Sequence, residues 1–231
     1  SASGAACHRH GADRQYVNLA TGNLLLQAQD EQLLFRGLAI GQVRTYNSQG
    51  QLGQVGADAW LTGFERRIQL LSGTSNEPGS AMRRHVGDGS VQDFVQVAPN
   101  QYRSTSGDGA HDTLQWDEAS RTWSFVEGSS RREEGYADHE DAVLQGRLTR
   151  IRSLASDAAE PTTWVVSYDA QQRIGEVRAQ DGTVAGDALV FAYDGAGRLS
   201  AISTREDGVV HGQVGYGYDS VGRLTTVLVD L

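Results

Sequence analysis

One group of residues near the start of the chain is of the types that bind transition metals. Cys7, His8 and His10 lie within four positions of one another. Their spacing matches no standard zinc site, and no fourth ligand lies nearby in the sequence. We therefore expect no metal at this position.

A second group consists of carboxylates that lie in glycine-rich stretches: Asp88, Asp108 and Asp112. Carboxylate oxygens are the ligands that calcium prefers, so a calcium site is the alternative interpretation of this group. Asp-Gly pairs are also ordinary in hairpin turns. We interpret these residues as turn residues and predict a protein without a metal or cofactor.

The sequence contains no recognisable catalytic motif. It has no Gly-x-Ser-x-Gly motif, and His111 and Asp112 are neighbours in the sequence, which does not make a catalytic dyad. Glu133 and Glu134 lie in a charged run that we interpret as a solvated face rather than the acid/base pair of a glycosidase. The sequence therefore predicts a protein that is not an enzyme.

Trp116 and Trp123 are the candidates for a ligand-binding role, with a carbohydrate as the ligand. Aromatic residues in strands with period 2 generally belong to the core. These two tryptophans lie beside expected turns, so we expect them to be the most exposed aromatic residues. An exposed indole offers an apolar face on which a sugar ring can stack.

The composition is that of an acidic all-β protein. The chain has 28 Gly but 3 Pro, and its Val, Thr, Tyr, Leu and Trp residues form short runs between turns. The net charge of −9, with arginine as the only basic residue apart from histidine, disfavours nucleic acids and anionic membranes as partners. The single cysteine excludes an internal disulfide, and no run of 18 apolar residues predicts a membrane span.

We divide the chain into three regions. Residues 1–14 show no periodicity and are expected to form a flexible lead. Residues 15–145 read as short strands and turns, and form an N-terminal β region. The charged stretch 127–145 is expected to be a long exposed connection at a subdomain boundary, with one short helix at 137–144.

The remaining residues, 146–231, contain a repeat with a period of 25 residues. Each unit has a Tyr-Asp pair, an Arg four residues after the Asp, and an apolar residue after the Arg. The residues of the three clear units are Tyr168, Asp169, Arg173, Tyr193, Asp194, Gly197, Arg198, Leu199, Tyr218, Asp219, Gly222, Arg223 and Leu224. Arg147 lies 26 residues before Arg173 and continues the series. A fixed period of this length indicates a repeat architecture of successive β-hairpins.

The residue types of the repeat predict the structure of its turn. The Asp carboxylate can accept backbone N–H groups two residues later, as in an Asx-turn. Gly197 and Gly222 can supply the left-handed residue that closes the turn, whereas the first unit has Gln171-Gln172 there. The Arg is close enough to pair with the Asp. The two apolar residues after each Arg are three positions apart, which predicts a β-bulge between them.

These motifs resemble the YD repeats of the Rhs/YD-repeat family, which includes bacterial Rhs toxins, insecticidal toxin-complex shells and teneurins. Residues 17–23 and 44–48 also resemble the segment that opens such repeat regions, so the resemblance covers about residues 15–231. It implies that the hairpins coil into a spiral sheet, which in the toxins forms a hollow shell around a toxic domain. Three clear units are too few to close a shell, and the sequence lacks the Asp-Pro-containing self-cleavage segment of Rhs proteins.

The resemblance implies a non-catalytic module of a large bacterial protein that is secreted or displayed at the cell surface. The module would be a scaffold or part of a toxin shell, with adjacent repeats or domains of the parent protein as its partners. The alternative is an adhesin-like module that binds a carbohydrate or a cell-surface partner.

Overall fold

A computed structural model describes residues 5–10, 13–19, 22–35, 38–48, 60–105, 109, 112–128, 130, 132–154, 162–181, 184–206 and 208–230. The regular elements of these residues are all β-strands, which confirms the predicted all-β fold. None of the described segments is a helix with the length and apolarity needed to cross a membrane.

The first sheet has five strands that follow one another in space as they do in the sequence. They are β1 (Ala5–His10), β2 (Asp13–Asn18), β3 (Asn23–Phe35), β4 (Leu38–Asn47) and β5 (Trp60–Thr62). β1 pairs with β2, with Cys7 opposite Tyr16. We expected a lead without regular structure here. The strand forms through backbone hydrogen bonds, which do not require the apolar alternation on which that prediction relied.

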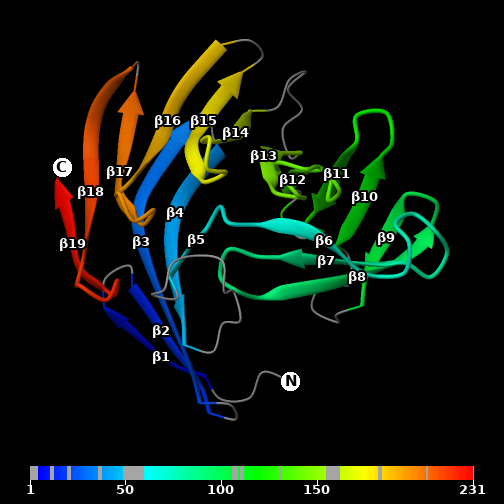
Figure 1. Cartoon of the computed structure of the whole chain (residues 1–231), viewed down its shortest axis with the longest axis horizontal. Helices are drawn as coiled ribbons and strands as arrows, with labels where there is room; N and C mark the ends of the chain where they lie inside the picture. Colours follow the sequence, from blue (N-terminus) through cyan, green and yellow to red (C-terminus); the bar gives the residue numbers. More distant parts are fainter. Residues whose placement is uncertain are drawn as a thin grey trace.

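The second sheet has fourteen strands, each hydrogen-bonded to its neighbour in the sequence. They are β6 (Arg67–Ser72), β7 (Ala81–His85), β8 (Val91–Ala98), β9 (Gln101–Ser104), β10 (Thr113–Asp117), β11 (Thr122–Val126), β12 (Arg132–Ala137), β13 (Leu148–Ser153), β14 (Thr163–Tyr168), β15 (Ile174–Asp181), β16 (Val184–Tyr193), β17 (Leu199–Glu206), β18 (Val209–Tyr218) and β19 (Leu224–Asp230). Figure 1 shows this sheet running from β6 round to β19. The expected N-terminal region and the repeat region therefore share one continuous sheet.

The second sheet curls until its first strand meets β13. The Ile68 N–H donates to the Gly146 carbonyl (2.8 Å), and the Leu148 N–H donates to the Arg66 carbonyl (3.0 Å). Gly146 has a φ of +76°, and a Cβ at this position would lie 2.0 Å from the Ile68 carbonyl oxygen. Glycine is thus required at the point where the two strands approach.

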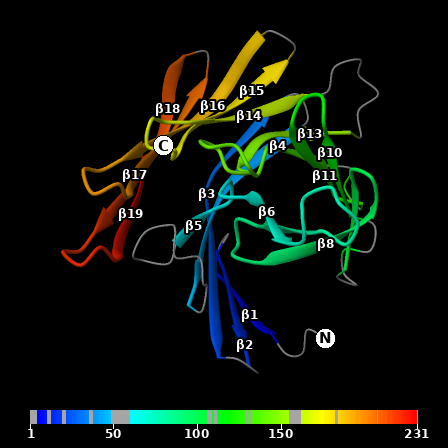
Figure 2. The same ribbon diagram turned by 45° about the vertical axis from the view of Figure 1, so that its right-hand side comes forward.

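The hairpin of β3 and β4 packs against the later strands of the second sheet. In both views these strands pass beside β14–β16 (Figures 1 and 2), and β3 contacts β16. The Tyr216 hydroxyl of β18 donates to the Asp30 carboxylate of β3 (2.7 Å). The Phe64 ring meets the Phe191 ring edge-on, with centroids 6.1 Å apart. These contacts join the first sheet to the repeat region through one core.

Each repeat strand carries a trio of large apolar residues at alternate positions that ends at the repeat tyrosine. The trios are Trp164, Val166 and Tyr168; Leu189, Phe191 and Tyr193; and Val214, Tyr216 and Tyr218. All three trios face this core, because alternate residues of a strand point to the same side of the sheet. Trp164, Leu189 and Val214 are fully buried, and each is the first member of its trio. The repeat tyrosines Tyr168, Tyr193 and Tyr218 are partly buried and pack against the core from its rim. The repeat tyrosine therefore packs against the core, and its hydroxyl donates to a backbone carbonyl.

The charged stretch 127–145 is an exposed connection only in part: residues 140–143 and 145 are exposed, whereas residues 133–138 are buried. Its centre is β12, in which the carboxylates Glu133 and Glu134 are buried. The interpretation of this pair as a solvated face is wrong, because the curl of the sheet covers β12 and supplies arginine partners to both carboxylates.

The short helix expected at 137–144 is absent, since β12 runs to Ala137 and turns follow it. Asp138 accepts the Glu140 N–H (3.0 Å), and Asp141 accepts the Val143 N–H (2.8 Å). Aspartate side chains that take backbone N–H groups in this way compete with helical hydrogen bonding.

Candidate functional site

Each repeat turn is closed by its aspartate. In the second unit, Asp194 Oδ1 accepts the N–H groups of Ala196 and Arg198, both at 2.9 Å. Its Oδ2 accepts the Nε–H of Arg198 at 2.8 Å. The backbone hydrogen bond from Arg198 is the largest cause that lowers the pKa of Asp194, followed by the side-chain hydrogen bond. The predicted Asx-turn and Asp–Arg pair are confirmed, and the other two units repeat them.

One residue of each turn adopts a left-handed conformation. Gly197 and Gly222 have φ values of +81° and +88°. In the first unit Gln172 takes this position with a φ of +61°. The first turn thus keeps the same backbone without glycine, at the steric cost that a side chain carries in this region.

A β-bulge follows each turn, as the spacing of the apolar residues predicts. Opposite Ala192 and Tyr193, the partners on β17 are Ala201 and Leu199, so one residue is extra. β13, β15 and β19 show the same shift after their own arginines. The extra residue lets both apolar side chains after the arginine face the core.

Successive units are linked by a contact that the sequence did not predict. The guanidinium of Arg173 lies 4.2 Å from the ring centroid of Tyr193, and that of Arg198 lies 4.6 Å from the ring of Tyr218. The hydroxyl of the stacked tyrosine donates to a carbonyl of the preceding unit, as Tyr193 does to Ile174 (2.9 Å). Each unit therefore holds the next by a cation–π contact and a hydrogen bond.

Arg147 begins this series but has no aspartate four residues before it. Its guanidinium lies 5.6 Å from the ring of Tyr168 and donates to the Gln172 carbonyl. Position 143, four residues earlier, is Val143, so the carboxylate found in later units is missing. Within the described part of the chain, Arg147 makes no ion pair.

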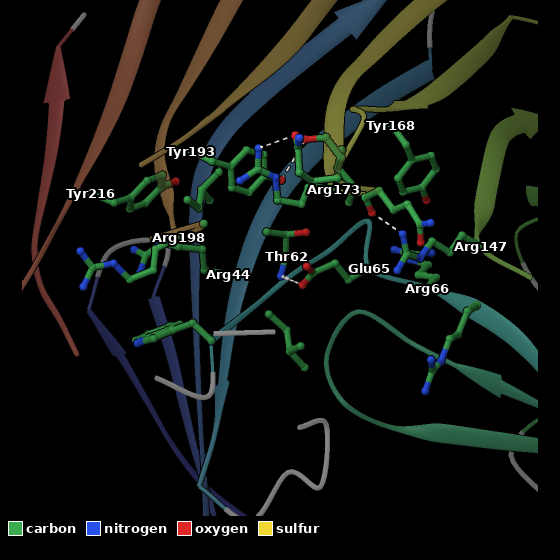
Figure 3. Close-up of a pocket in the computed structure, with 18 of the residues that line it drawn as sticks. Arg44, Thr62, Glu65, Arg66, Arg147, Tyr168, Arg173, Tyr193, Arg198 and Tyr216 are labelled. Carbon is green, nitrogen blue, oxygen red and sulfur yellow. Dashed lines mark hydrogen bonds between the residues drawn. The ribbon is translucent and has the colours of Figure 1, made fainter. Parts of the chain in front are cut away.

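The ends of the repeat turns, together with β5 and the loop after it, enclose a cavity of about 340 Å³ (Figure 3). Six arginines line it, and Glu65 is the one carboxylate among the described residues of its wall. The six are Arg44, Arg66, Arg67, Arg147, Arg173 and Arg198. Tyr168, Tyr193 and Tyr216 also lie at the wall (Figure 3). Sequence reasoning missed this cavity because its residues come from separate stretches of the chain.

A buried ion cluster lies beside the cavity. Glu134 Oε2 accepts from Arg84 Nη2 (2.6 Å), and its other oxygen pairs with Arg66. The Tyr136 hydroxyl also donates to Glu134. Burial opposes the ionisation of Glu134, but the two guanidiniums outweigh it and lower its pKa to about 2. Glu134 is thus ionised at neutral pH and ties β12 to β7 and to the loop before β6.

The two tryptophan candidates form no exposed platform. Trp123 is fully buried, contrary to our expectation, and its indole N–H donates to His139 Nδ1 (3.2 Å). Trp116 is partly buried and packs on Trp123 with ring centroids 5.0 Å apart. The rings of Tyr102, Trp116 and His139 pack around Trp123, which its position near a turn could not reveal.

Two of the aspartates that were considered as calcium ligands, Asp88 and Asp112, accept hydrogen bonds from groups of the protein. Asp88 accepts the Ser90 N–H (2.9 Å). Asp112 accepts the Gly128 N–H (3.0 Å) and the Gln92 side-chain amide (2.7 Å). Asp108 lies outside the described residues, as do the side chains of Cys7, His8 and His10. The described residues contain no cluster of three or more potential metal-binding side chains.

A search of curated proteins found no match to the chain. A family model described as RHS Repeat matches residues 193–230, which hold β17, β18, β19 and the two turns that contain glycine. Repeats of this family are structural and generally non-enzymatic, and the proteins that carry them are generally extracellular or at the cell surface. The interlocked hairpins at the end of this chain are thus repeats of the Rhs/YD-repeat family.

Proposed function

We propose that this chain is a non-catalytic structural module of a large bacterial YD-repeat protein, secreted or displayed at the cell surface. The observation that carries the proposal is the contact between units, in which each arginine stacks on the tyrosine of the next hairpin. Because the arginine of each turn contacts the tyrosine of the next hairpin, each hairpin stabilises the addition of another hairpin to the same sheet. The module serves as a scaffold or as part of a toxin shell.

The buried carboxylates support a structural rather than a catalytic role. Glu133 pairs with Arg152 (2.7 Å), and Glu134 pairs with Arg84 (2.6 Å). Both are neutralised in the core, whereas an acid/base pair needs access to a substrate. Their partners hold neighbouring parts of the curled sheet together.

The outer edge of β19 is the surface on which a further hairpin would pair. Leu228 and Val229 are 68% and 57% exposed, and the side chain of Arg223 is 75% exposed. An open strand edge with apolar side chains favours pairing with another chain. We expect purified protein to associate as its concentration rises, in a measurement by size-exclusion chromatography with light scattering.

Two matched variants test whether this association occurs at the edge of β19. Leu228→Lys with Val229→Lys should keep the protein monomeric, because charge on an edge strand opposes pairing. Val221→Lys, at an exposed position in the preceding turn, should associate as the unmodified protein does. A wild-type protein that stays monomeric at every concentration would contradict the proposed role of this edge.

A further inference from the structure

The seam at which the second sheet closes on itself places two arginines opposite each other. Arg67 of β6 and Arg147, the residue before β13, are directly paired in an antiparallel bridge, and both line the cavity. The Cβ atoms of directly opposite residues are roughly 5 Å apart, and like charges in such a pair are destabilising. Burial lowers the pKa of Arg67, and the charge of Arg147 lowers it further. Closure of the sheet therefore has an electrostatic cost at this point.

Arg147 makes no ion pair within the described part of the chain, unlike the arginines of the complete repeat units. In those units the Nε and Nη2 groups face the aspartate of the turn, as Arg173 does with Asp169 at 2.8 and 2.7 Å. Arg147 instead donates to the Gln172 carbonyl through Nη1. Its Nε and Nη2 groups therefore remain available as donors to an anion.

The carboxylates nearest to Arg147 bind other groups. Asp138, in the same turn, pairs with Arg121. Glu65 of the cavity wall accepts a backbone N–H of β5 (2.8 Å), and it is not among the groups that shift the pKa of Arg67. We therefore expect the counter-ion of Arg147 to come from the solution.

A histidine extends the pair of arginines to a row across three strands. His85 of β7 lies opposite Arg67 on the other side of β6, and it also lines the cavity. Its Nε2 contacts Gln69 Oε1 (3.0 Å), and because an amide oxygen only accepts, Nε2 carries the hydrogen. Nδ1 is then an acceptor, and it is buried without a partner among the described residues.

The surroundings of His85 keep its ring neutral. Burial lowers its pKa most, and the charges of Arg67 and Arg83 lower it further, against the opposite effect of Asp93. The row thus presents two guanidiniums that donate and one imidazole nitrogen that accepts.

We propose that this row binds one hydrogen phosphate dianion, and that the bound ion ties β13 to β6 and β7. Its oxygens accept from Nε and Nη2 of Arg147 and from the guanidinium of Arg67, and its single O–H donates to Nδ1 of His85. The ion replaces the repulsion between the two arginines by attraction across the seam. This site is independent of the scaffold role.

The chemistry of the row favours hydrogen phosphate over other anions. A carboxylate brings one negative charge and two acceptor oxygens, whereas phosphate brings two charges and a tetrahedral set of oxygens to groups on three strands. Sulfate has the same charge and shape but no O–H, so it leaves Nδ1 of His85 without a donor. The dianion of a phosphate monoester lacks the O–H as well.

The direct test is isothermal titration of the whole chain at about pH 8, where phosphate is mainly the dianion and His85 is neutral. The titrants are phosphate, sulfate, glycerol phosphate and acetate, at one ionic strength set with sodium chloride. Phosphate should bind saturably at one site per chain. Sulfate and glycerol phosphate should bind about threefold more weakly or less, because one hydrogen bond is missing, and acetate should bind weakest.

Two results of this titration would overturn the proposal. They are the absence of saturable phosphate binding and equal binding of phosphate and sulfate. Tighter binding of glycerol phosphate would overturn the assignment to the free ion in favour of a monoester. Thermal unfolding gives a second readout, since phosphate should raise the unfolding temperature more than sulfate at equal concentration.

A matched pair of arginine variants separates this site from general charge effects. Arg147→Met should weaken phosphate binding about tenfold or more, because the charge-assisted hydrogen bonds of one guanidinium are lost. Arg173→Met loses the same kind of contact with the next repeat tyrosine, but its guanidinium already has Asp169 as a partner. It should change phosphate binding less than about threefold. Equal losses in the two variants would contradict the proposed site.

His85→Leu keeps the test valid if the arginine variants fold poorly. The side chain is half-buried and its Nδ1 has no partner to lose, so thermal unfolding without phosphate should change little. The preference for phosphate over sulfate should disappear, because neither ion then has an acceptor for an O–H. A preference that persists in this variant would show that His85 does not contact the ion.

Discussion

Each of the three main residues of the repeat makes contacts that stabilise the turn or link neighbouring units. The aspartate accepts backbone and guanidinium donors, the arginine also covers the next tyrosine ring, and the tyrosine hydroxyl reaches back to a carbonyl. The contacts of the aspartate within its own turn were predictable, because an Asx-turn and a left-handed residue depend only on neighbouring positions. The Arg–Tyr contact joins residues 20 positions apart, such as Arg173 and Tyr193, and depends on how the hairpins stack.

The left-handed position of the turn gives a prediction at this scale. Gln172→Gly should stabilise the protein by about 0.5–1 kcal/mol, because glycine adopts a positive φ without the steric cost of a side chain. The reciprocal variant Gly197→Gln should destabilise it by about 1 kcal/mol. Urea unfolding measures both changes. Equal stability of the two variants would show that the turns do not need this conformation.

At the scale of elements, the bulge after each arginine and the close approach at Gly146 shape the sheet. The bulges were predictable from the three-residue spacing of apolar side chains, such as Leu199 and Ile202. The meeting of β6 with β13 was not, since it joins residues 78 positions apart, such as Ile68 and Gly146. The same curl buries β12, which explains why a charged sequence was misread as an exposed connection.

The Gly146 contact can be tested by adding one methyl group. Gly146→Ala should destabilise the protein by more than about 2 kcal/mol, because its Cβ would collide with the Ile68 carbonyl and its φ is positive. Gly195→Ala is the matched control, as nothing lies within 4 Å of its added Cβ. Thermal and urea unfolding report the difference. A small effect at Gly146 would mean that β6 does not meet β13 in this way.

At the scale of the whole molecule, the two sheets share a core and enclose a cavity whose residues are far apart in the sequence. Arg44, Thr62 and Arg147 come from β4, β5 and the turn before β13. No local pattern connects them, so sequence analysis placed ligand binding at Trp116 and Trp123 instead. The family resemblance predicted the hairpin architecture. A site between two sheets depends on the complete fold and could not be predicted in this way.

The buried ion cluster predicts how the whole molecule responds to acid. The pKa of Glu134 is about 2 in the folded state, below the value of roughly 4.3 in an unfolded chain. Its contribution to stability is therefore full above about pH 4 and is lost as the pH falls toward 2. Glu134→Gln should destabilise the protein by about 3 kcal/mol or more at pH 7, because Arg84 and Arg66 lose their partner.

The same variant should also flatten the pH dependence. Urea unfolding at several pH values between 2 and 7 compares the wild type with Glu134→Gln, and the gap between them should narrow toward the acid end. A constant gap across this range would show that Glu134 is not the ionised centre of the cluster.

The central claim is that each hairpin holds the next through its arginine and tyrosine. A double-mutant cycle of Arg173→Met and Tyr193→Leu, read by urea unfolding, tests it most directly. We predict a coupling free energy of about 0.5–1 kcal/mol between these residues, and additive effects for Arg173→Met with Tyr218→Leu, whose tyrosine stacks under Arg198 instead. Additive effects in both pairs would contradict the claim.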